Sequence, residues 1–547
     1  MIGLALVLLV SARSAASGPA EATCLTAIEP QVGAAANGDT IVLWRCESLD
    51  RLQTAYRSAA TGSWSRLDDI PPAAMDDPRV DLRSPALAVN GRGDAAATWG
   101  VLSLYKGGIF SLVQAAVRPV GATSWSAAES LSLPNTVAVA PHIAIDASGN
   151  AVAVWAARDG SCYSDCRWRM QAAVRPAASG AWGEPQDLAA PSPALSTAEV
   201  AFDGAGSALV VWAEGPVLRA ALRPAGAGGW NPPQLISDEG ARGPVESPRL
   251  AVDSAGNALV IWGHGSQGGS RPVSVRAALR SAATGAWSAQ DLPGTSDLRS
   301  VLQLALAMNV SGDAAAVWRR GTDSSAPVVI EASLRDASSG RWTPPQRLSG
   351  VRFRDGLPPL DNLPGAPGVA LDAHGNAVAV WQEPVHTEYA TCPEAPCLSI
   401  AVAAVRPAAT GIWSAPERWP AAAPQVAAGP ADTAVAVWTG YELHTLRCSG
   451  DPCLIVQAAV HERGEGTWSA PTYLSAPAPR PCVVPRVVGK ALARAKAAVK
   501  RRDCSVGRIS YRRSTEVRRG RVLAQRPKAG ARLRAGSSVR LVVSWGR

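Results

Sequence analysis

The chain has 547 residues, 47% of them hydrophobic, with 19 Trp against only 3 Phe and 7 Tyr. This bias argues against an ordinary globular enzyme and is typical of one short unit that is copied many times. Residues 481–547 carry 19 basic and 2 acidic residues, a net charge of +17, and the rest of the chain carries 34 basic and 42 acidic residues, a net charge of −8. We therefore expect an acidic repetitive body followed by a strongly basic domain.

The first 22 residues predict a secretory signal peptide. About nine apolar residues follow Met1, and small residues lead to Ala20-Glu21-Ala22, which is typical of cleavage before Thr23. The run is too short to span a bilayer, and the basic residues that usually precede such a run are missing. A buried strand is the alternative. We expect a secreted protein that loses residues 1–22.

Two sequence signatures alternate between Ile28 and Leu474, and each predicts a β-hairpin. The first is an apolar strand, a turn such as Asp146-x-x-Gly-Asn, and a strand ending in Trp. These Trp recur 50 to 63 residues apart: Trp44, Trp99, Trp155, Trp212, Trp262, Trp318, Trp381 and Trp438. The second is Gln-Ala-Ala-Val-Arg-Pro, a turn with Gly, and another Trp: Trp64, Trp125, Trp182, Trp230, Trp287, Trp342, Trp413 and Trp468. The two series define eight units.

Two hairpins in each unit predict a four-stranded antiparallel sheet. Its strands carry Ala on one face and Val or Trp on the other, so both faces need an apolar cover, which the neighbouring units can supply. Sheets repeating at this period typically close radially, so residues 23–475 resemble a bacterial β-propeller of eight Trp-rich repeats. The strand near Ile28 either opens the first blade or completes the last. The repeated Trp are expected to pack between blades rather than to stack on a ligand.

Ten cysteines form five pairs of near neighbours, which predict disulfides in an oxidising compartment. The pairs are Cys24 and Cys46, Cys162 and Cys166, Cys392 and Cys397, Cys448 and Cys453, and Cys482 and Cys504. Zinc is the alternative, but the spacings are not those of a CxxC knuckle and no His pair lies nearby. Three of the pairs lie between the two hairpins of their units. We expect their loops to share one rim, where a propeller typically binds its ligand.

Two other repeated features are candidate sites. The turn carboxylates, as at Asp146, are expected to cap turn amides, because one Asp and one Asn fall short of the oxygen ligands that calcium needs; no metal or cofactor is predicted. An Arg occupies one position in seven units, with His461 in the eighth: Arg57, Arg118, Arg175, Arg223, Arg280, Arg335 and Arg406. These Arg either form a cationic ring for an anionic glycan, or bond carbonyls or a carboxylate of the next unit, which we favour.

After a Pro-rich linker, residues 476–481, the sequence predicts a small α+β domain. An amphipathic helix is expected over Lys490 to Arg502, and strands over Val506 to Tyr511, Arg521 to Gln525 and Ser538 to Ser544. Residues 482–547 resemble a PASTA domain in Val484-Pro485, Gly489, Leu492, Ala495, the Cys504 to Gly507 motif, the Gly520-x-Val-x-x-Gln-x-Pro-x-x-Gly530 motif, Gly536 and Leu541 to Gly546. The resemblance implies an extracellular location and, for some members, binding of uncrosslinked peptidoglycan or β-lactam-like ligands. Such domains often occur in tandem on a kinase or transpeptidase, whereas this chain has one copy, so no ligand residues are carried over.

These features predict a secreted, wall-associated binding or scaffold protein. The basic domain would bind peptidoglycan or anionic wall polymers non-covalently, and the propeller would present a face to a glycan or protein. Nucleic acid and a transmembrane span are not expected. The alternative is a propeller-type glycan hydrolase or lyase, but no catalytic motif appears and the Asp-to-Trp spacing differs from that of sialidase boxes. Candidate acids that follow repeat Trp residues are Asp159, Asp165, Glu214, Glu383 and Glu388.

Overall fold

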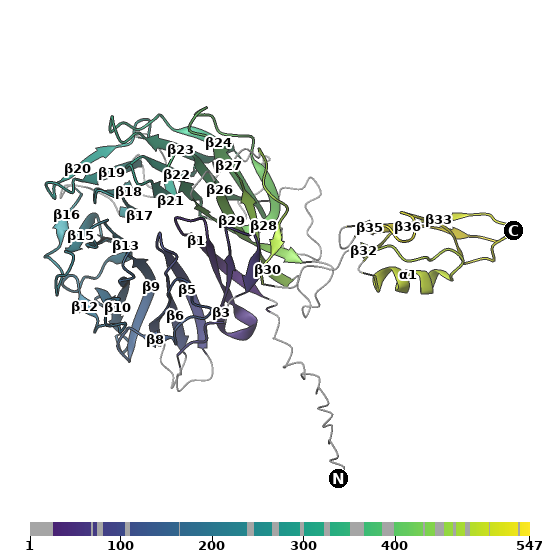
Figure 1. Ribbon diagram of the computed structural model, residues 1–547, viewed down its shortest axis with the longest axis horizontal. Coiled ribbons are helices and arrows are strands. Elements are labelled where there is room, and N and C mark those ends of the chain that lie inside the picture. The colour runs from purple at the N-terminus through teal and green to yellow at the C-terminus, as the bar shows by residue number, and fades with distance from the viewer. Residues whose placement is uncertain are drawn as a thin grey trace, which may run out of the picture.

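The computed structural model describes residues 24, 26–66, 69–73, 80–103, 110–162, 165–237, 245–264, 273–295, 300–321, 329–350, 366–384, 399–429, 433–442, 453–462, 466–475, 482–502, 504–533 and 537–546. The predicted signal peptide and its cleavage site lie outside these residues. The described chain is mainly β, with many sheets and one α-helix (Figure 1). None of its helices is long and apolar enough to cross a membrane.

The repeats form eight four-stranded units, numbered here in chain order. Units 1 to 4 contain β1 (Ala27–Ala34), β2 (Thr40–Cys46), β3 (Arg51–Arg57), β4 (Trp64–Arg66); β5 (Val80–Val89), β6 (Ala95–Ser103), β7 (Phe110–Arg118), β8 (Glu129–Ser130); β9 (Thr136–Ile145), β10 (Ala151–Asp159), β11 (Arg169–Arg175), β12 (Gln186–Asp187); β13 (Leu195–Phe202), β14 (Ala208–Glu214), β15 (Val217–Arg223) and β16 (Gln234–Leu235). A 3-10 helix, Glu47–Leu49, links β2 to β3.

Units 5 to 8 repeat the pattern, with one strand shared between the last two units. They contain β17 (Val245–Val252), β18 (Ala258–His264), β19 (Ser274–Arg280), β20 (Trp287–Asp291); β21 (Ser300–Met308), β22 (Ala314–Gly321), β23 (Val329–Arg335), β24 (Gln346–Gly350); β25 (Gly368–Leu371), β26 (Ala377–Pro384), β27 (Ser399–Arg406), β28 (Glu417–Ala428); β29 (Ala434–Glu442), β30 (Cys453–His461) and β31 (Thr472–Tyr473). The first part of β28 pairs with β27 and its second part with β29.

Strands within each unit pair in chain order and antiparallel, as two successive hairpins should. In unit 1, β1 pairs with β2 from Ala27 opposite Cys46 to Ala34 opposite Thr40. The strand near Ile28 therefore opens the first unit and does not complete the last. A single parallel bridge, Ser111 to Val137, joins units 2 and 3.

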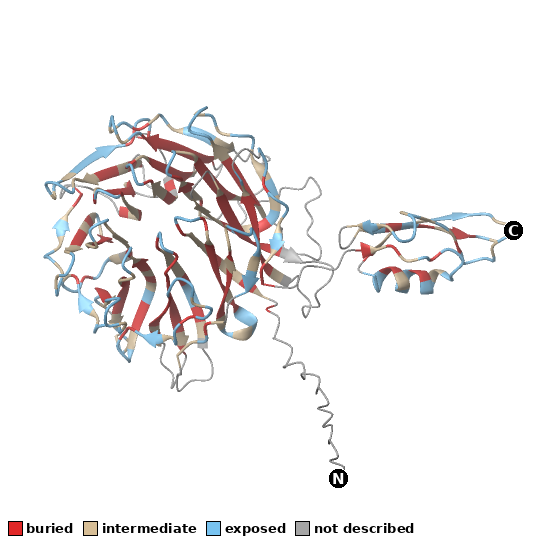
Figure 2. Ribbon diagram, in the orientation of Figure 1, coloured by how far each residue is buried: buried red, intermediate tan, exposed pale blue. Residues whose placement is uncertain are grey.

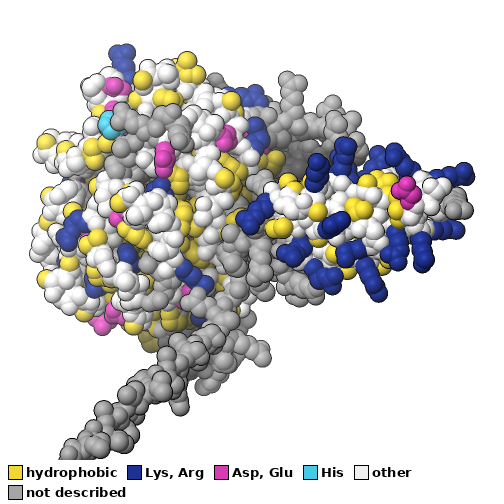
Figure 3. All heavy atoms as spheres, turned by 45° about the vertical axis from the view of Figure 1, so that its right-hand side comes forward, with side chains coloured by type: hydrophobic (Ala, Val, Ile, Leu, Met, Phe, Trp, Pro, Cys, Tyr) yellow, Lys and Arg dark blue, Asp and Glu magenta, His cyan; other side chains and the backbone are white. Residues whose placement is uncertain are grey.

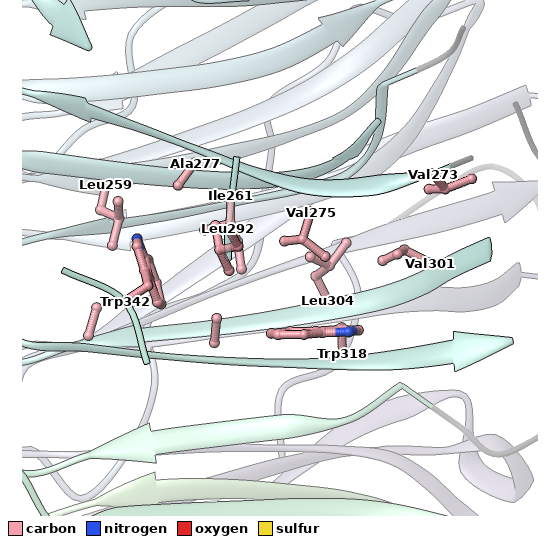
Figure 4. Close-up of a cluster of buried hydrophobic side chains, with 12 residues drawn as sticks. Leu259, Ile261, Val273, Val275, Ala277, Leu292, Val301, Leu304, Trp318 and Trp342 are labelled. Carbon is pink, nitrogen blue, oxygen red and sulfur yellow. The ribbon is translucent and has the colours of Figure 1, made fainter. Parts of the chain in front are cut away.

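The cores of the repeats lie between neighbouring units, because successive side chains of a strand point to opposite faces. In β2, Val42 and Trp44 belong to a cluster with Val437 of unit 8, whereas Ile41 and Leu43 belong to a cluster with unit 2. Figure 4 shows the equivalent cluster between units 5 and 6, in which Leu259, Ile261 and Val275 face Leu304 and Trp318. Each sheet is thus covered on both sides by other sheets.

The units follow one another around a circle in Figure 1, and buried strands occupy its interior in Figure 2. The first strand of each unit contacts the first strand of the next, from β1 with β5 to β21 with β25. The strand β1 also contacts β28, β29 and β30 of the last units, and Thr26 forms a parallel bridge with Leu454. Unit 1 is therefore packed between unit 2 and unit 8.

The eight Trp of the first signature are completely buried, which confirms packing as their role. Each lies on the second strand of its unit and packs against the preceding unit, as Trp155 does against β6 and β7. Three of the indole N–H groups donate to a Gln on the third strand, as in Trp155 Nε1 to Gln171 Oε1 at 3.1 Å. A large ring that fills the space between sheets fixes their separation.

A carboxylate and an amide hold the turn between the first two strands of several units. In unit 3, Asp146 Oδ1 accepts the backbone N–H groups of Ser148 and Asn150, and the Asn150 amide donates to Asp146 Oδ2 at 2.7 Å. The Asn150 Oδ1 then accepts the N–H of Ala177, which lies in the turn of the second hairpin. Units 5 and 7 repeat this arrangement. The pair ties the two hairpins of a unit together.

Units 2 and 6 have the same pair in reverse order. There an Asn begins the turn and donates to an Asp at its end, as in Asn90 Nδ2 to Asp94 Oδ2 at 2.9 Å, and that Asp accepts the N–H of Val120. Unit 6 uses Asn309 and Asp313 in the same way. Each of these turns therefore contains one amide and one carboxylate, whichever comes first.

The C-terminal domain has the expected elements. The helix α1 (Leu492–Lys500) lies within the predicted range, and β33 (Ser505–Arg512), β36 (Ser538–Ser544) and β34 (Val522–Arg526) form a three-stranded sheet in that order. The short strands β32 (Cys482–Val483) and β35 (Arg532–Leu533) pair separately. Its core contains Val484, Val487, Ala495, Val499, Val522, Val539 and Leu541, and all members of this cluster belong to residues 482–541.

The reversed turns predict a rescue in unit 3. The variant Asn150→Asp places two carboxylates in one turn and removes the amide donor, so it should lower the free energy of unfolding by about 1–3 kcal/mol at neutral pH. Adding Asp146→Asn recreates the order of units 2 and 6 and should restore most of this stability. Urea unfolding followed by Trp fluorescence measures both. If the double variant is no more stable than Asn150→Asp, the amide and the carboxylate of this turn are not interchangeable.

Candidate functional site

The surface of the C-terminal domain is strongly cationic. Every Lys and Arg that the structure describes in this domain is exposed, from Arg486 to Arg540. Many dark blue side chains project from the visible part of the domain in Figure 3, with white and yellow surface between them. Glu516 is the acidic residue among the described residues of this domain. The apolar side of α1 and one side of the sheet face the core, which leaves the charged residues for the outer surface. Such a surface attracts polyanions.

Two exposed aromatic rings lie near the end of this domain. The side chains of Tyr511 and Trp545 are 54% and 62% exposed, and their ring centroids are 6.1 Å apart. The backbone N–H of Trp545 donates to the carbonyl of Arg512, which fixes the start of the terminal segment. Exposed aromatic rings among cations suit a ligand that has both an apolar ring face and negative charge.

The seven arginines of the predicted ring all lie at the end of the third strand of their units. In five units the guanidinium lies over the glycine of the following turn, with Nη2 3.2–3.8 Å from the position that a Cβ on that glycine would occupy. These arginines are Arg57, Arg175, Arg280, Arg335 and Arg406. In four of these units the distance is an ordinary van der Waals contact, and only at Gly411 is it tighter, so it is the positive φ of the turn that favours glycine.

Several of these arginines have partners inside the fold. The Nη2 of Arg57 lies 3.2 Å from the Glu462 carboxylate of unit 8. Arg335 donates to the carbonyl of Gly312, and Arg406 donates to that of Gly411. Gly312 and Gly411 belong to the same units as their arginines, so of these three arginines only Arg57 joins two units. A cationic ring for an anionic glycan stays a prediction.

Arg118 lies in a different environment from these arginines. Its turn has the glycine at position 121, two residues earlier than in the five units above, and the guanidinium lies over the ring of Tyr56 in unit 1, 5.4 Å from the ring centroid. The Tyr56 hydroxyl donates to Asp39 Oδ2 at 2.7 Å. These three residues line a cleft of about 400 Å³ between units 1 and 2.

The charges in this cleft influence one another. Burial alone raises the pKa of Asp39, but hydrogen bonds from the Ala59 N–H, the Tyr56 hydroxyl and the Asn37 amide outweigh it and hold that pKa below its usual value. Burial, followed by the bond to the Asp39 carboxylate, raises the pKa of Tyr56. Burial also lowers the pKa of Arg118, against the attraction of Asp39. Asp39 is therefore ionised at neutral pH, and Tyr56 is protonated.

The cleft lies away from the rim where the sequence predicts binding. Asp39 and Arg118 adjoin the turns that follow β1 and β7, whereas the loop between Cys162 and Cys166 follows β10 at the opposite ends of the strands. The candidate ring residue His461 lines a second cleft of about 270 Å³ between units 7 and 8, at the position equivalent to Arg118. The repeat thus places similar clefts at the same edge of the sheets.

Disulfides join Cys24 to Cys46, Cys162 to Cys166 and Cys482 to Cys504. The first lies in the cluster between units 1 and 8, and the third lies in the core of the C-terminal domain. The pair Cys392 and Cys397 lies outside the described residues, as does Cys448. Among the residues that are described, no three His, Cys, Asp or Glu side chains are grouped so that they would hold a metal ion.

The candidate acids of the enzyme alternative have local partners where they are described. Glu214 pairs with Arg219, and Glu383 accepts hydrogen bonds from Trp381 and Arg418. Asp159 accepts hydrogen bonds from the hydroxyl and backbone N–H of Ser161. Asp165 has a positive φ of 53° in its loop, and Glu388 lies outside the described residues. None of these four described acids lines either of the two clefts described above.

Comparison with known proteins identifies one domain. Residues 483–544 match the PASTA domain family, so this part of the chain is a PASTA domain. No curated protein matches the chain.

Similar solved structures are remote. An ulvan lyase, a polysaccharide lyase, bound to -[GlcA(1-4)Rha3S]- is 10% identical over 64% of this chain and 88% of its own, with a TM-score of 0.40. A protein of unknown function from Dyadobacter fermentans is 13% identical over 57% and 95%, with a TM-score of 0.34. The NanB sialidase from Streptococcus pneumoniae is 8% identical over 73% and 80%, with a TM-score of 0.35. These values are too low to assign a function.

Sequence reasoning missed the cleft between units 1 and 2, although the sequence contains two signals for it. Tyr56 stands where every other unit has Val or Leu, and the turn glycine after Arg118 is shifted to position 121. Asp39 lies at the end of its turn, as Asn150 does in unit 3. The hydrogen bond that Asp39 accepts from the Ala59 N–H is therefore a repeated feature, whereas the hydrogen bond from Tyr56 is specific to unit 1. The sequence did not predict the contact between Tyr56 and Arg118, because it depends on how units 1 and 2 pack against each other.

The bond between Tyr56 and Asp39 predicts a pH-dependent effect of Tyr56→Phe. The pKa of Asp39 is depressed in the folded protein, so its contribution to stability is present above the unfolded value of 3.8 and is lost as the pH falls further. The variant should lower the free energy of unfolding by about 1 kcal/mol at pH 7 and by less at pH 3. Urea unfolding at both pH values measures this, with Tyr511→Phe as the control at an exposed tyrosine. An equal loss at both pH values would contradict it.

Proposed function

We propose that this protein is a secreted binding or scaffold protein of the cell envelope, in which the PASTA domain binds peptidoglycan or an anionic wall polymer. The observation that carries the proposal is the PASTA domain with its net charge of +17 and its exposed cations. Wall polymers carry carboxylates and phosphates, which attract such a surface over roughly a Debye length of 10 Å at 0.1 M salt. The paired Tyr511 and Trp545 rings add a surface on which a sugar ring can stack.

We further propose that units 1 to 8 form one eight-bladed propeller, with residues 23–475 as its domain. Three observations support this architecture: the four-stranded units, the apolar clusters between successive units, and the cluster that packs unit 1 against unit 8. Residues 1–22 are proposed as the signal peptide, residues 476–481 as the linker and residues 482–547 as the C-terminal domain. The disulfides fit an oxidising, extracellular location.

The two regions then have different tasks. The body is net negative and would be repelled by anionic polymers, whereas the basic domain would be attracted to them. Binding to the wall is therefore assigned to the PASTA domain, and the propeller presents a face to a glycan or a protein. The runner-up function, glycan cleavage by the propeller, rests on the same proposed architecture and predicts soluble products from its substrate.

Co-sedimentation with insoluble peptidoglycan tests this division of tasks. The full chain and residues 482–547 should pellet with the wall, and a chain that ends at Ser475 should remain in solution, because it lacks the cationic domain. The isolated C-terminal domain is expected to fold because its core uses only its own residues. The supernatants are assayed for released sugar. Pelleting of the chain that ends at Ser475 would contradict the assignment, and released fragments would favour the enzyme.

A comparison of binding at low and high salt distinguishes the contribution of the domain's charge from that of its aromatic rings. Replacing Arg512, Arg513, Arg518 and Arg519 by Gln should reduce pelleting several-fold at about 0.1 M salt and have little further effect at about 1 M, where charges are screened beyond about 3 Å. Trp545→Ala should weaken binding at both salt concentrations, because stacking on a sugar does not depend on ionic strength. Tyr473→Ala, in the body of the protein, is the matched aromatic control. If binding by all variants depended equally on salt, charge and aromatic stacking would not contribute separately to wall binding.

A further inference from the structure

The cleft between units 1 and 2 contains a buried cation without a hydrogen-bond acceptor. Arg118 is only 5% exposed, and its Nε is buried without a partner, as are the Nε atoms of Arg57, Arg175 and Arg223. Within the part of the chain that the structure describes, the guanidinium has a face-on contact with Tyr56 but no hydrogen bond. Buried arginines normally satisfy several of their five N–H donors, because leaving them unpaired costs free energy.

The nearby Asp39 carboxylate does not supply the missing acceptor. Its oxygens already accept the Ala59 N–H at 2.8 Å, the Tyr56 hydroxyl at 2.7 Å and the Asn37 amide at 2.8 Å. Asp39 attracts Arg118 through space and so compensates part of its charge. The donors of the guanidinium remain available to an acceptor that enters the cleft.

The shifted glycine and the tyrosine together explain why Arg118 differs from the equivalent arginines. In unit 3, the equivalent guanidinium lies beside Gly180 of its own turn. In unit 2 the glycine is at position 121, and a Cβ built there would meet no atom within 4 Å. The guanidinium instead reaches Tyr56 across the boundary with unit 1. Unit 4 has the same short turn, but the unit before it has Val174 in place of the tyrosine.

The rest of the lining defines the shape of a ligand. Ile41, Val89 and Val120 supply apolar walls, and Ser65 and Thr123 supply hydroxyl groups. The Arg66 guanidinium also lines the cleft but is paired with Asp69 at 2.9 Å. A volume of about 400 Å³ lies within the usual range of small-molecule sites.

We infer that this cleft binds a small carboxylate, with Arg118 donating to the carboxylate and the apolar walls covering the body of the ligand. A carboxylate matches the planar fork of a guanidinium and replaces the missing acceptors with charge-assisted hydrogen bonds. The inference rests on the proposed role of the N-terminal region as a ligand-binding region and names the chemistry of its ligand. A uronic acid sugar and the free carboxylate of a peptide both carry this group.

Calorimetric titration of the full-length protein with four probes tests the inference. Glucuronate and N-acetylalanine carry the carboxylate, and glucose and N-acetylalanine amide are their uncharged counterparts. At least one carboxylate should bind, with an affinity at least tenfold higher than its counterpart, and the pair that shows this identifies the source. Equal binding of charged and uncharged probes overturns the inference, as does the absence of binding at about 50 mM, well above the Kd of a weak millimolar complex.

Variants locate the binding in the cleft. Arg118→Gln should weaken carboxylate binding by about tenfold to a hundredfold, the loss expected for charge-assisted hydrogen bonds. Arg280→Gln, at the equivalent position of unit 5, is the control and should bind as the wild type does. Unchanged binding by Arg118→Gln overturns the inference.

A second pair of variants does not depend on the stability of Arg118→Gln. Val120 is 48% exposed and lines the cleft, so Val120→Trp should fill the space and abolish binding without disturbing the core. Val310 is 60% exposed in a turn of unit 6, and Val310→Trp should have no effect. Both variants should still pellet with peptidoglycan, because that binding is assigned to the PASTA domain. Failure of the inference about the cleft can thereby be distinguished from failure of the proposal about wall binding.

Discussion

The N-terminal region depends on one constraint, namely that every sheet is apolar on both faces. Alternate side chains of β2 point into two different clusters, one shared with unit 2 and one with unit 8. A lone unit would expose both faces to water, at a cost of about 25 cal/mol for each Å² of apolar surface. Each sheet therefore needs a cover on both faces, and the fully buried Trp of the second strand lies in the cluster that each unit shares with its neighbour.

The turns show how a repeated structure tolerates changes in sequence. One amide and one carboxylate are sufficient to hold the turn and to accept an N–H from the second hairpin, so Asp146 with Asn150 and Asn90 with Asp94 perform the same task in opposite orders. A repeated Arg then packs over the second turn in most units. Where the glycine of that turn is displaced and a tyrosine lies opposite, as at Arg118, the guanidinium is directed towards the neighbouring unit and becomes available to a ligand.

The exposed cations of the PASTA domain and the buried Arg118 of the cleft suit two different kinds of anionic ligand. The PASTA domain has a small core stapled by Cys482 and Cys504, so most of its side chains remain at the surface, and these are largely cationic. Such a surface favours polymeric anions and depends on salt. The cleft at Arg118 instead buries a single cation beside an aromatic ring and apolar walls, an arrangement that suits one small anion.

The sequence by itself determined the features that depend on short-range patterns. Alternation, Trp spacing and turn glycines predicted the eight pairs of hairpins, and helical periodicity with spaced motifs predicted the PASTA domain and its elements around α1. These features depend on neighbouring residues in the chain. Only the tertiary structure decided that β1 opens unit 1, that Arg57 meets Glu462 of unit 8, and that Tyr56 lies against Arg118. The reason is physical: such contacts join residues of different units, and their geometry is set by how whole sheets pack against one another.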